Sequence, residues 1–129
     1  MTELYEGYFD GSATPNPGQM KIGGFVKRVS DNIEVHKYSI DLGYGTNNEA
    51  EYLSLIELCD KLENLGVKKI NIYGDSQLVV NQVNGLWQAR DKRMQGFKSN
   101  VLKLLSSVPD WTLQHVRRGM NMEADSLTR

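Results

Sequence analysis

Two carboxylates lie two residues apart in the segment TNNEAEY (46–52), directly before a leucine-rich run. Side chains at this spacing point to nearly opposite sides of a helix, so at most one of the two can face a site. At about 3.6 residues per turn, Glu51 shares a stripe with four leucines. These are Leu55, Leu58, Leu62 and Leu65. We therefore expect Glu51 to face inward, where a carboxylate needs a partner or a function, and Glu49 to be a solvated charge.

Three aspartates lie at the ends of other predicted elements. Asp10 ends the predicted first strand (YFDGS), Asp75 ends the predicted fourth (YGDSQ), and Asp125 lies in the first turn of the predicted last helix. In open α/β sheets ligands bind beyond the carboxyl ends of strands, so adjacent parallel strands would place Asp10 beside Asp75. A single aspartate of this kind is usually a turn residue or compensates a helix dipole. Four carboxylates at element ends that could converge are harder to explain in that way.

Converging carboxylates would repel one another and raise each other's pKa values. A divalent cation relieves this repulsion, and an all-oxygen ligand set favours Mg²⁺ or Mn²⁺. Carboxylates that bridge two such ions are a usual apparatus for phosphoryl transfer. The pattern therefore predicts metal-dependent chemistry on a phosphate ester.

The elements that must position these side chains follow from the hydrophobic pattern. Strands are predicted at 4–10, 22–29, 33–42, 68–73 and 111–116, and helices at 48–65, 76–83 and 91–105. A turn at 12–18 joins the first two strands, Gly66 ends the first helix, and Asn121 is expected to N-cap a final helix. Three strands joined by short turns and followed by alternating helices and strands predict an α/β fold, with a mixed sheet that is antiparallel in one half and parallel in the other.

The length and composition limit the number of domains, the cellular compartment and the kind of partner. The 129 residues are expected to form one domain (1–129), with no apolar run near the roughly 20 residues of a membrane span. The start, MTELYEGYFD, shows no secretory signal. Cys59 is the only cysteine, which excludes an internal disulfide and a cysteine zinc site and favours a reducing, cytoplasmic setting. Because it lies at the edge of the Leu55–Leu62 stripe, we expect it to be a small core residue. The formal charge of −1 means that a nucleic-acid partner must be held by a local patch.

Four segments, in this order, resemble ribonuclease H of type 1. They are FDGS (9–12), TNNEAEY (46–52), YGDSQLVVNQ (73–82) and HVRRGMNMEAD (115–125), and together they span nearly the whole chain. The resemblance implies a five-stranded mixed sheet, three antiparallel strands followed by two parallel ones, flanked by helices. It also implies endonucleolytic hydrolysis of the RNA strand of an RNA–DNA hybrid, leaving 5′-phosphate and 3′-hydroxyl ends.

The same resemblance implies roles for individual residues. Asp10, Glu51, Asp75 and Asp125 would be catalytic and would hold two Mg²⁺ ions, with Mn²⁺ as a substitute. Asn16, Asn47, Asn48 and Gln77 would contact the hybrid, and their amides suit 2′-hydroxyls and minor-groove edges. Backbone N–H groups of Gly11 and Ser12 could contact a phosphate, although any turn exposes such groups. The alternative for Asn47 and Asn48 is helix capping.

The sequence departs from many family members in two places. Where they carry a loop histidine, this chain resembles a subgroup with arginine, here Arg118, and His115 is expected to be structural. The segment 84–97 (NGLWQARDKRMQGF) has few basic residues, so the chain resembles the compact form that lacks a basic handle. Within that segment Trp87 either stacks on the substrate or caps the core. Elsewhere, Gly23-Gly24 indicates a β-bulge or a close approach of a nucleic-acid backbone, and we favour the bulge.

Several functions compete on this basis. The leading prediction is an endoribonuclease that acts as a monomer on RNA–DNA hybrids, with double-stranded RNA as a further candidate substrate and no membrane partner. The alternative is a non-catalytic module of the same fold that binds hybrid or double-stranded RNA, but all four carboxylates are present. An integrase-like or 3′–5′ exonuclease would lack the TNNEAEY segment. A plain α/β domain would leave an inward-facing Glu51 unexplained.

Overall fold

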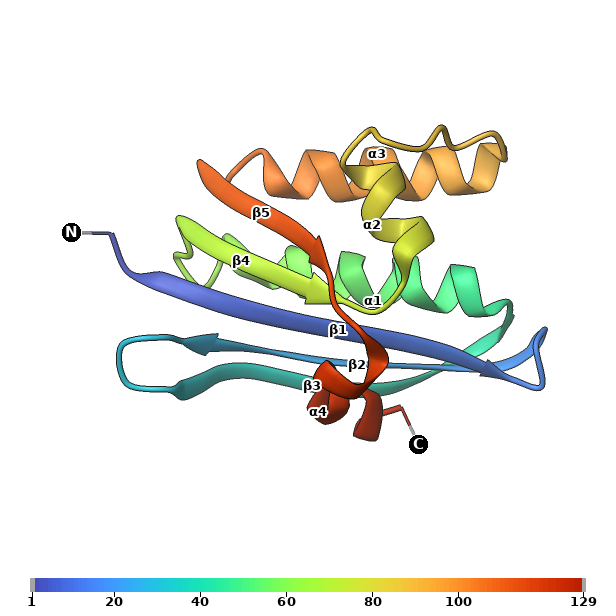
Figure 1. Ribbon diagram of the computed structural model, residues 1–129, viewed down its shortest axis with the longest axis horizontal. Helices are drawn as coiled ribbons and strands as arrows, with labels where there is room; N and C mark the ends of the chain where they lie inside the picture. Colours follow the sequence, from blue (N-terminus) through green and yellow to red (C-terminus); the bar gives the residue numbers. More distant parts are fainter. Residues whose placement is uncertain (1, 129) are drawn as a thin grey trace.

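The computed structural model describes residues 2–128 and contains a mixed five-stranded sheet in the order β3-β2-β1-β4-β5 (Figure 1). The strands are β1 (Leu4–Thr14), β2 (Gly18–Arg28), β3 (Ile33–Gly45), β4 (Lys69–Gly74) and β5 (Asp110–His115). The first three pair antiparallel, whereas β4 runs parallel to both β1 and β5. The predicted fold class is therefore confirmed.

Helices cover both faces of the sheet. They are α1 (Asn47–Leu62), α2 (Gln77–Val83), α3 (Lys92–Leu105), a single 3₁₀ turn η1 (Arg118–Met120) and α4 (Met122–Ser126). Figure 1 shows α1 behind the sheet and α4 in front of it. The leucine stripe of α1 packs into the core as expected, because Leu55, Leu58 and Leu62 are each 0% exposed. Cys59 is buried in the same core.

The first strand is longer than predicted, and Asp10 does not end it. β4 pairs with β1 only as far as Phe9, whereas β1 continues to Thr14 because β2 still offers antiparallel partners there. The turn that was expected at 12–18 is confined to 15–17. Asp10 consequently lies where the parallel pairing stops and the antiparallel pairing goes on.

Gly23 and Gly24 do not form a bulge, so that prediction is wrong. They pair in continuous register with Asp10 and Phe9 of β1. A Cβ at Gly23 would lie 2.5 Å from the Cβ of Leu127, and one at Gly24 would lie closer than 3.0 Å to the hydroxyl of Tyr38. Since successive strand residues face opposite sides, the two glycines make room for the α4 region on one face and for Tyr38 on the other.

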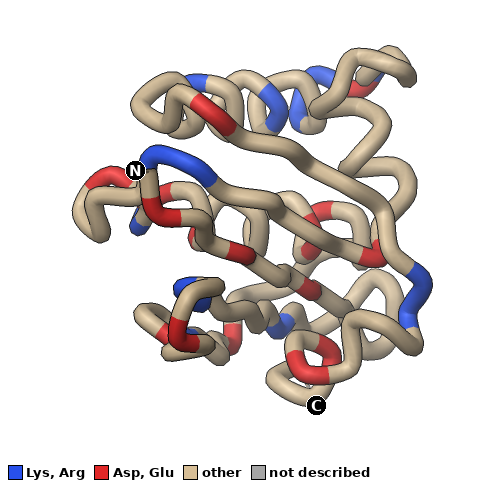
Figure 2. Tube along the Cα trace, turned by 60° about the vertical axis from the view of Figure 1, so that its left-hand side comes forward, with Lys and Arg blue, Asp and Glu red and all other residues tan. Residues whose placement is uncertain are grey.

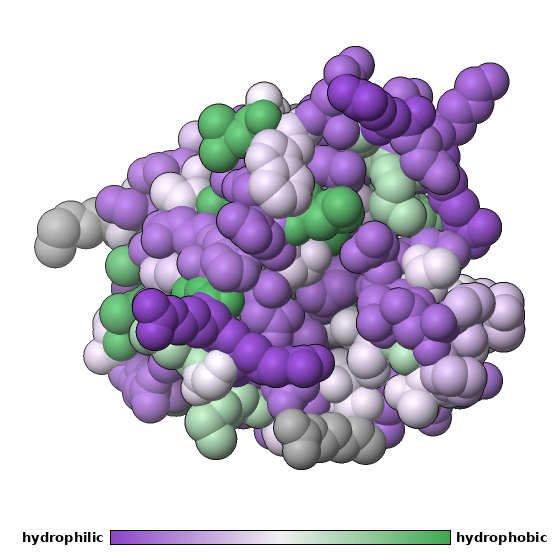
Figure 3. Space-filling view, turned by 45° about the vertical axis from the view of Figure 1, so that its right-hand side comes forward, coloured by the Kyte–Doolittle hydropathy of each residue, from purple (hydrophilic) through white to green (hydrophobic). Residues whose placement is uncertain are grey.

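The surface carries mixed charge and scattered apolar groups. Figure 2 shows acidic and basic positions interspersed along the trace, and Figure 3 shows a mainly hydrophilic face with small separate apolar patches. Trp87 is 45% exposed, so part of its ring is free to stack on a substrate. Among residues 2–128, no helix is long and apolar enough to cross a membrane.

Candidate active site

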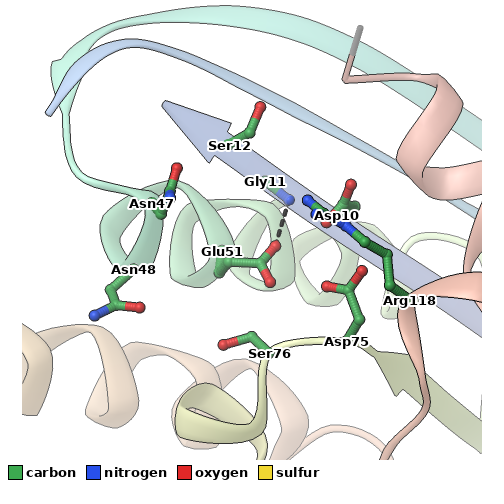
Figure 4. Close-up of a pocket in the computed structure, with 9 residues that line it drawn as sticks. All are labelled: Asp10, Gly11, Ser12, Asn47, Asn48, Glu51, Asp75, Ser76 and Arg118. Carbon is green, nitrogen blue, oxygen red and sulfur yellow. Dashed lines mark hydrogen bonds between the residues drawn. The ribbon is translucent and has the colours of Figure 1, made fainter. Parts of the chain in front are cut away.

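Three carboxylates from three different elements meet beside the carboxyl end of β4, where β1 continues past it. Asp10 comes from β1, Glu51 from the second turn of α1, and Asp75 follows β4. One oxygen of each lies within 4.8 Å of the others. They line a pocket of about 310 Å³ together with Gly11, Ser12, Asn47, Asn48, Ser76 and Arg118 (Figure 4). The structure thus brings together three of the four carboxylates that were expected to converge.

Glu51 is positioned by direct contact between α1 and β1 at Gly11. A Cβ at Gly11 would lie 2.6 Å from the backbone nitrogen of Glu51 and would also overlap Ala50, so only glycine lets the helix approach this closely. The N–H of Gly11 donates a hydrogen bond to Oε1 of Glu51. That N–H is therefore paired with Glu51, so a phosphate would have to share it. Ser12 remains at the pocket wall.

A buried hydrogen-bond network fixes α1 one turn beyond Glu51. The Tyr38 hydroxyl donates to the Ser54 carbonyl at 2.8 Å, and the Ser54 hydroxyl donates to the Gly23 carbonyl at 3.0 Å. Gly23 is the cross-strand partner of Asp10. The network therefore ties the helix that carries Glu51 to the strand position opposite Asp10. Such fully satisfied buried networks favour one arrangement of the elements.

Two carboxyl groups of the cluster hold protons more strongly than free acids do. Burial, the charge of Asp75 and a hydrogen bond with Asp125 raise the pKa of Asp10 to about 7. Burial, followed by the charges of Asp10 and Asp75, raises the pKa of Glu51 well above its ordinary value. Oδ2 of Asp75 is buried and has no hydrogen-bond partner among the described residues. A cation among these oxygens would relieve both effects.

Asp125 lies beside the cluster rather than within it. It is on α4, outside the group of three, yet its hydrogen bond contributes to the raised pKa of Asp10. Arg118 of η1 reaches the pocket wall with its side chain 77% exposed and its Nε 4.0 Å from Oδ1 of Asp125. The α4 region therefore brings both a carboxylate and a guanidinium to the site.

The predicted substrate contacts are distributed unevenly around the pocket. Asn47 and Asn48 line it, whereas Asn16 lies in the adjoining groove and Gln77 is an exposed residue at the start of α2, outside the pocket lining. The Asn47 side chain accepts from the Ala13 N–H at 2.7 Å, and the Asn47 N–H donates to Asn16 Oδ1 at 3.0 Å. Neither Asn47 nor Asn48 caps α1, because the N-cap is Thr46.

Glu49 is not a solvated charge, so that prediction is wrong. Its side chain is only 12% exposed and pairs with Arg93 of α3, with Oε2 2.9 Å from Nη2. Its N–H also donates to the Thr46 hydroxyl at 3.1 Å. Both residues of the pair line a groove of about 680 Å³ next to the carboxylates. The helical pattern of α1 alone could not show that α3 packs against this side.

Three further residues differ in whether they line the pocket and in whether they cap a helix. His115 is an exposed residue at the end of β5 and does not line the pocket. Asn121 stands at the N-cap position of α4, but its side chain does not cap the helix as predicted. It donates instead to the Phe9 carbonyl at 2.9 Å. Ser76, which the sequence reasoning missed, lines the pocket and caps α2, and a serine before a helix could have signalled it.

Comparison with known proteins gives consistent results over nearly the whole chain. A family model described as reverse transcriptase-like matches residues 8–129. A ribonuclease HI of Halobacterium salinarum is 36% identical over 120 residues, which is 93% of this chain but 60% of that protein. The chain thus spans less than two thirds of that relative's length.

Solved structures extend the comparison to the fold. The RNase H1 crystal structure from Halobacterium salinarum has a TM-score of 0.91 at 34% identity, covering 97% of this chain and 94% of that one. LC11-RNase H1, solved in complex with an RNA/DNA hybrid, has a TM-score of 0.89 at 28% identity, covering 96% and 93%.

Proposed function

The chain belongs to the reverse transcriptase-like family, as a ribonuclease H type 1-like member, and from this premise we propose that it hydrolyses the RNA strand of RNA–DNA hybrids internally. The observation that carries the proposal is the group Asp10, Glu51 and Asp75, with one oxygen of each within 4.8 Å of the others. The hybrid in the complex of the similar LC11-RNase H1 supports the substrate class.

The residues at the site fit divalent cations. The donors are carboxylate oxygens, burial and then the charge of Asp75 raise the pKa of Asp10, and Asp75 Oδ2 is buried without a hydrogen-bond partner in the described chain. Asp10, Glu51, Asp75 and Asp125 would hold Mg²⁺, with Mn²⁺ as a substitute. When bound, two such ions supply Lewis acidity to the phosphate and a lowered pKa for an attacking water.

The chain's own groups would bind and orient the hybrid. Asn47 and Asn48 stand at the pocket wall, where side-chain amides can test for 2′-hydroxyls and so distinguish RNA from DNA. Ser12 lines the same wall and has a hydroxyl for the sugar–phosphate backbone. Asn16 and Gln77 lie outside this pocket and would contact the hybrid farther from the cut. Hydrolysis at this site would leave 5′-phosphate and 3′-hydroxyl ends.

Arg118 would take the place of a loop histidine, but with a different chemical role. A guanidinium keeps its proton in proteins, so Arg118 cannot act as a general base. Its exposed side chain beside Asp125 can instead stabilise the charge of a phosphate as product leaves. Between α2 and α3 the described chain has only turns, bends and irregular structure, which supports the compact form without a basic handle.

Cleavage of an end-labelled RNA–DNA hybrid tests the proposal. The purified protein is assayed with Mg²⁺, with Mn²⁺ and with EDTA, alongside single-stranded RNA, duplex RNA and duplex DNA. We expect metal-dependent internal cuts in the RNA strand of the hybrid. Asp10→Asn should abolish them, whereas Asp60→Asn, which changes an exposed carboxylate on α1, should not.

The remaining outcomes separate the alternatives. A folded wild-type protein that binds the hybrid without cutting it would overturn the proposal in favour of a binding module. Cuts in duplex RNA would extend the substrate range to double-stranded RNA. Cleavage that persists in EDTA or in Asp10→Asn would contradict a metal site at these carboxylates.

A further inference from the structure

The α4 region is fastened to β1 by two buried side chains on either side of the helix. Asn121, which precedes α4 and is 1% exposed, donates from Nδ2 to the Phe9 carbonyl at 2.9 Å. Thr128, which follows α4 and is 9% exposed, has its hydroxyl 3.2 Å from Oδ2 of Asp10. The two contacts fall on neighbouring residues of β1, and the second reaches a carboxylate of the cluster itself.

The opposite strand is shaped to allow this approach. Gly23 of β2 pairs with Asp10, and a Cβ there would lie 2.5 Å from the Cβ of Leu127, the residue before Thr128. A larger residue at Gly23 would therefore push this end of the α4 region away from Asp10. The closeness of Thr128 to the carboxylate is thus built into the sheet as well as into the helix.

The Thr128 hydroxyl joins two carboxylate-bearing elements. It is 3.2 Å from Asp10 Oδ2 and 2.8 Å from the backbone carbonyl of Asp125. A hydroxyl has one proton and can donate to either acceptor, so it lies between β1 and α4. A partner on one oxygen restricts the rotation of the Asp10 carboxylate, and the link to α4 holds Asp125 near it.

We propose that Thr128 is a positioning residue for the metal site, orienting the carboxylate of Asp10 and holding the helix of Asp125 against it. This inference rests on the proposed function, because it gives Thr128 a task only if these carboxylates bind metal. An apolar side chain there would leave Asp10 Oδ2 without this partner in a buried site. The competing explanation is that Thr128 only closes the end of α4 through its bond to the Asp125 carbonyl.

Calorimetric titration with Mn²⁺ alone distinguishes the two explanations. The variants are Thr128→Val, which removes the hydroxyl and keeps the branched shape, Thr128→Ala as a smaller second variant, and Thr128→Ser, which restores the hydroxyl. Thr112→Val is a matched control, because Thr112 is exposed on β5, bonds to Asn71 and does not line the pocket. The unfolding temperature of each metal-free protein is measured alongside.

We expect Thr128→Val and Thr128→Ala to weaken Mn²⁺ binding about tenfold, since removing an outer partner of a metal-ligating carboxylate has effects of this size. The kcat should fall at limiting metal and recover with excess Mn²⁺, while the KM for the hybrid stays constant. Thr128→Ser and Thr112→Val should behave as wild type. Equal Mn²⁺ affinity in wild type and both hydroxyl-free variants would overturn the inference, as would equal impairment of Thr128→Ser.

The same titration keeps the two proposals apart. If wild type binds Mn²⁺ and Asp10→Asn does not, the metal site stands, and only the Thr128 variants decide the present inference. If wild type binds no Mn²⁺, or Asp10→Asn binds as well as wild type, both proposals are overturned. Should Thr128→Val fail to fold, Thr128→Ala against Thr128→Ser gives the same comparison.

Discussion

The pKa of Asp10 is determined by the groups packed around its carboxyl in the folded protein. Its pKa rises from 3.8 to about 7, chiefly through burial and then through the charge of Asp75. In the unfolded chain this group ionises at the lower value, so between these two pH values the metal-free folded protein keeps a proton that the unfolded chain has lost. Stability must therefore fall as pH rises through this window.

Metal-free stability should consequently depend on pH through Asp10. In EDTA, Asp10→Asn should gain free energy of unfolding relative to wild type as pH rises from 4 to about 7, by roughly 2 to 4 kcal/mol, because the variant has no charge to bury. Urea unfolding at several pH values measures the difference. A constant offset between the two proteins across this range would show that Asp10 ionises normally in the folded state.

The carboxylates also show where residue-level prediction succeeds and fails. Glu51 was placed correctly, because the periodicity of a helix that packs on a sheet determines which side chains face inward. Glu49 was misplaced, because its partner Arg93 comes from α3, and the pattern of one helix carries no information about a second helix beside it. The proximity of Thr128 to Asp10 was equally invisible, since it depends on how α4 docks.

The contact between α1 and β1 belongs to the scale of elements. Gly11→Ala should force the first turns of α1 off the strand, because the new Cβ would lie 2.6 Å from the Glu51 nitrogen and would overlap Ala50. We expect a loss of about 1–3 kcal/mol in stability from overpacking. Cleavage should fall about a hundredfold, because Glu51 would move relative to Asp10.

Urea unfolding and the hybrid-cleavage assay check this prediction. Gly43→Ala is the control, since a Cβ at Gly43 of β3 meets nothing within 4 Å. It should leave both stability and activity near wild type. A fully active Gly11→Ala would mean that α1 can approach β1 in another way and that its contact at Gly11 does not set the position of Glu51.

The order and type of the elements could be predicted, but their ends could not. The change from alternating to helical apolar periodicity marked the strands and the first three helices, but not η1 or α4, which are too short to show a period. The last helix was expected only from Asn121 as an N-cap, and the Asn121 side chain does not cap it. The glycine and prolines near residue 15 suggested a long turn, yet β1 and β2 remain paired up to Thr14 and Gln19. Pairing with a neighbouring strand overrode the local signal there.

At the scale of the whole molecule, charge does not mark one face for nucleic acid. The net charge is −1, and Figure 2 shows both signs interspersed. The order of the elements predicted a mixed sheet with an antiparallel and a parallel half, and the resemblance to ribonuclease H implied five strands. The structure has both features, and it brings three of the four expected carboxylates into one group. We expect hybrid binding to depend on a few cations beside the groove, and the pairing of one of them, Arg93 with Glu49, is visible only in the folded protein.

Two of these cations line the groove next to the carboxylates. Arg90 and Arg93 do so, with Arg93 already paired with Glu49, and Lys92 is exposed nearby. Each phosphate neutralised by a cation contributes about −0.9 to the slope of log K against log salt for duplex DNA. With about three such contacts, the slope for hybrid binding should be about −2 to −3 rather than the steeper value of a strongly basic protein.

Fluorescence anisotropy of a labelled hybrid, with Asp10→Asn as background to prevent cleavage and the metal concentration held constant, measures this slope. Arg90→Gln should make it shallower by about 1, because one phosphate contact is lost. Lys61→Gln is the matched control, since Lys61 lies in the last turn of α1, about 20 Å along the helix from the groove. It should change neither the slope nor the affinity. A slope of about −6 or steeper would mean that many more cations contact the hybrid than this groove provides, and that the duplex also lies on another part of the surface.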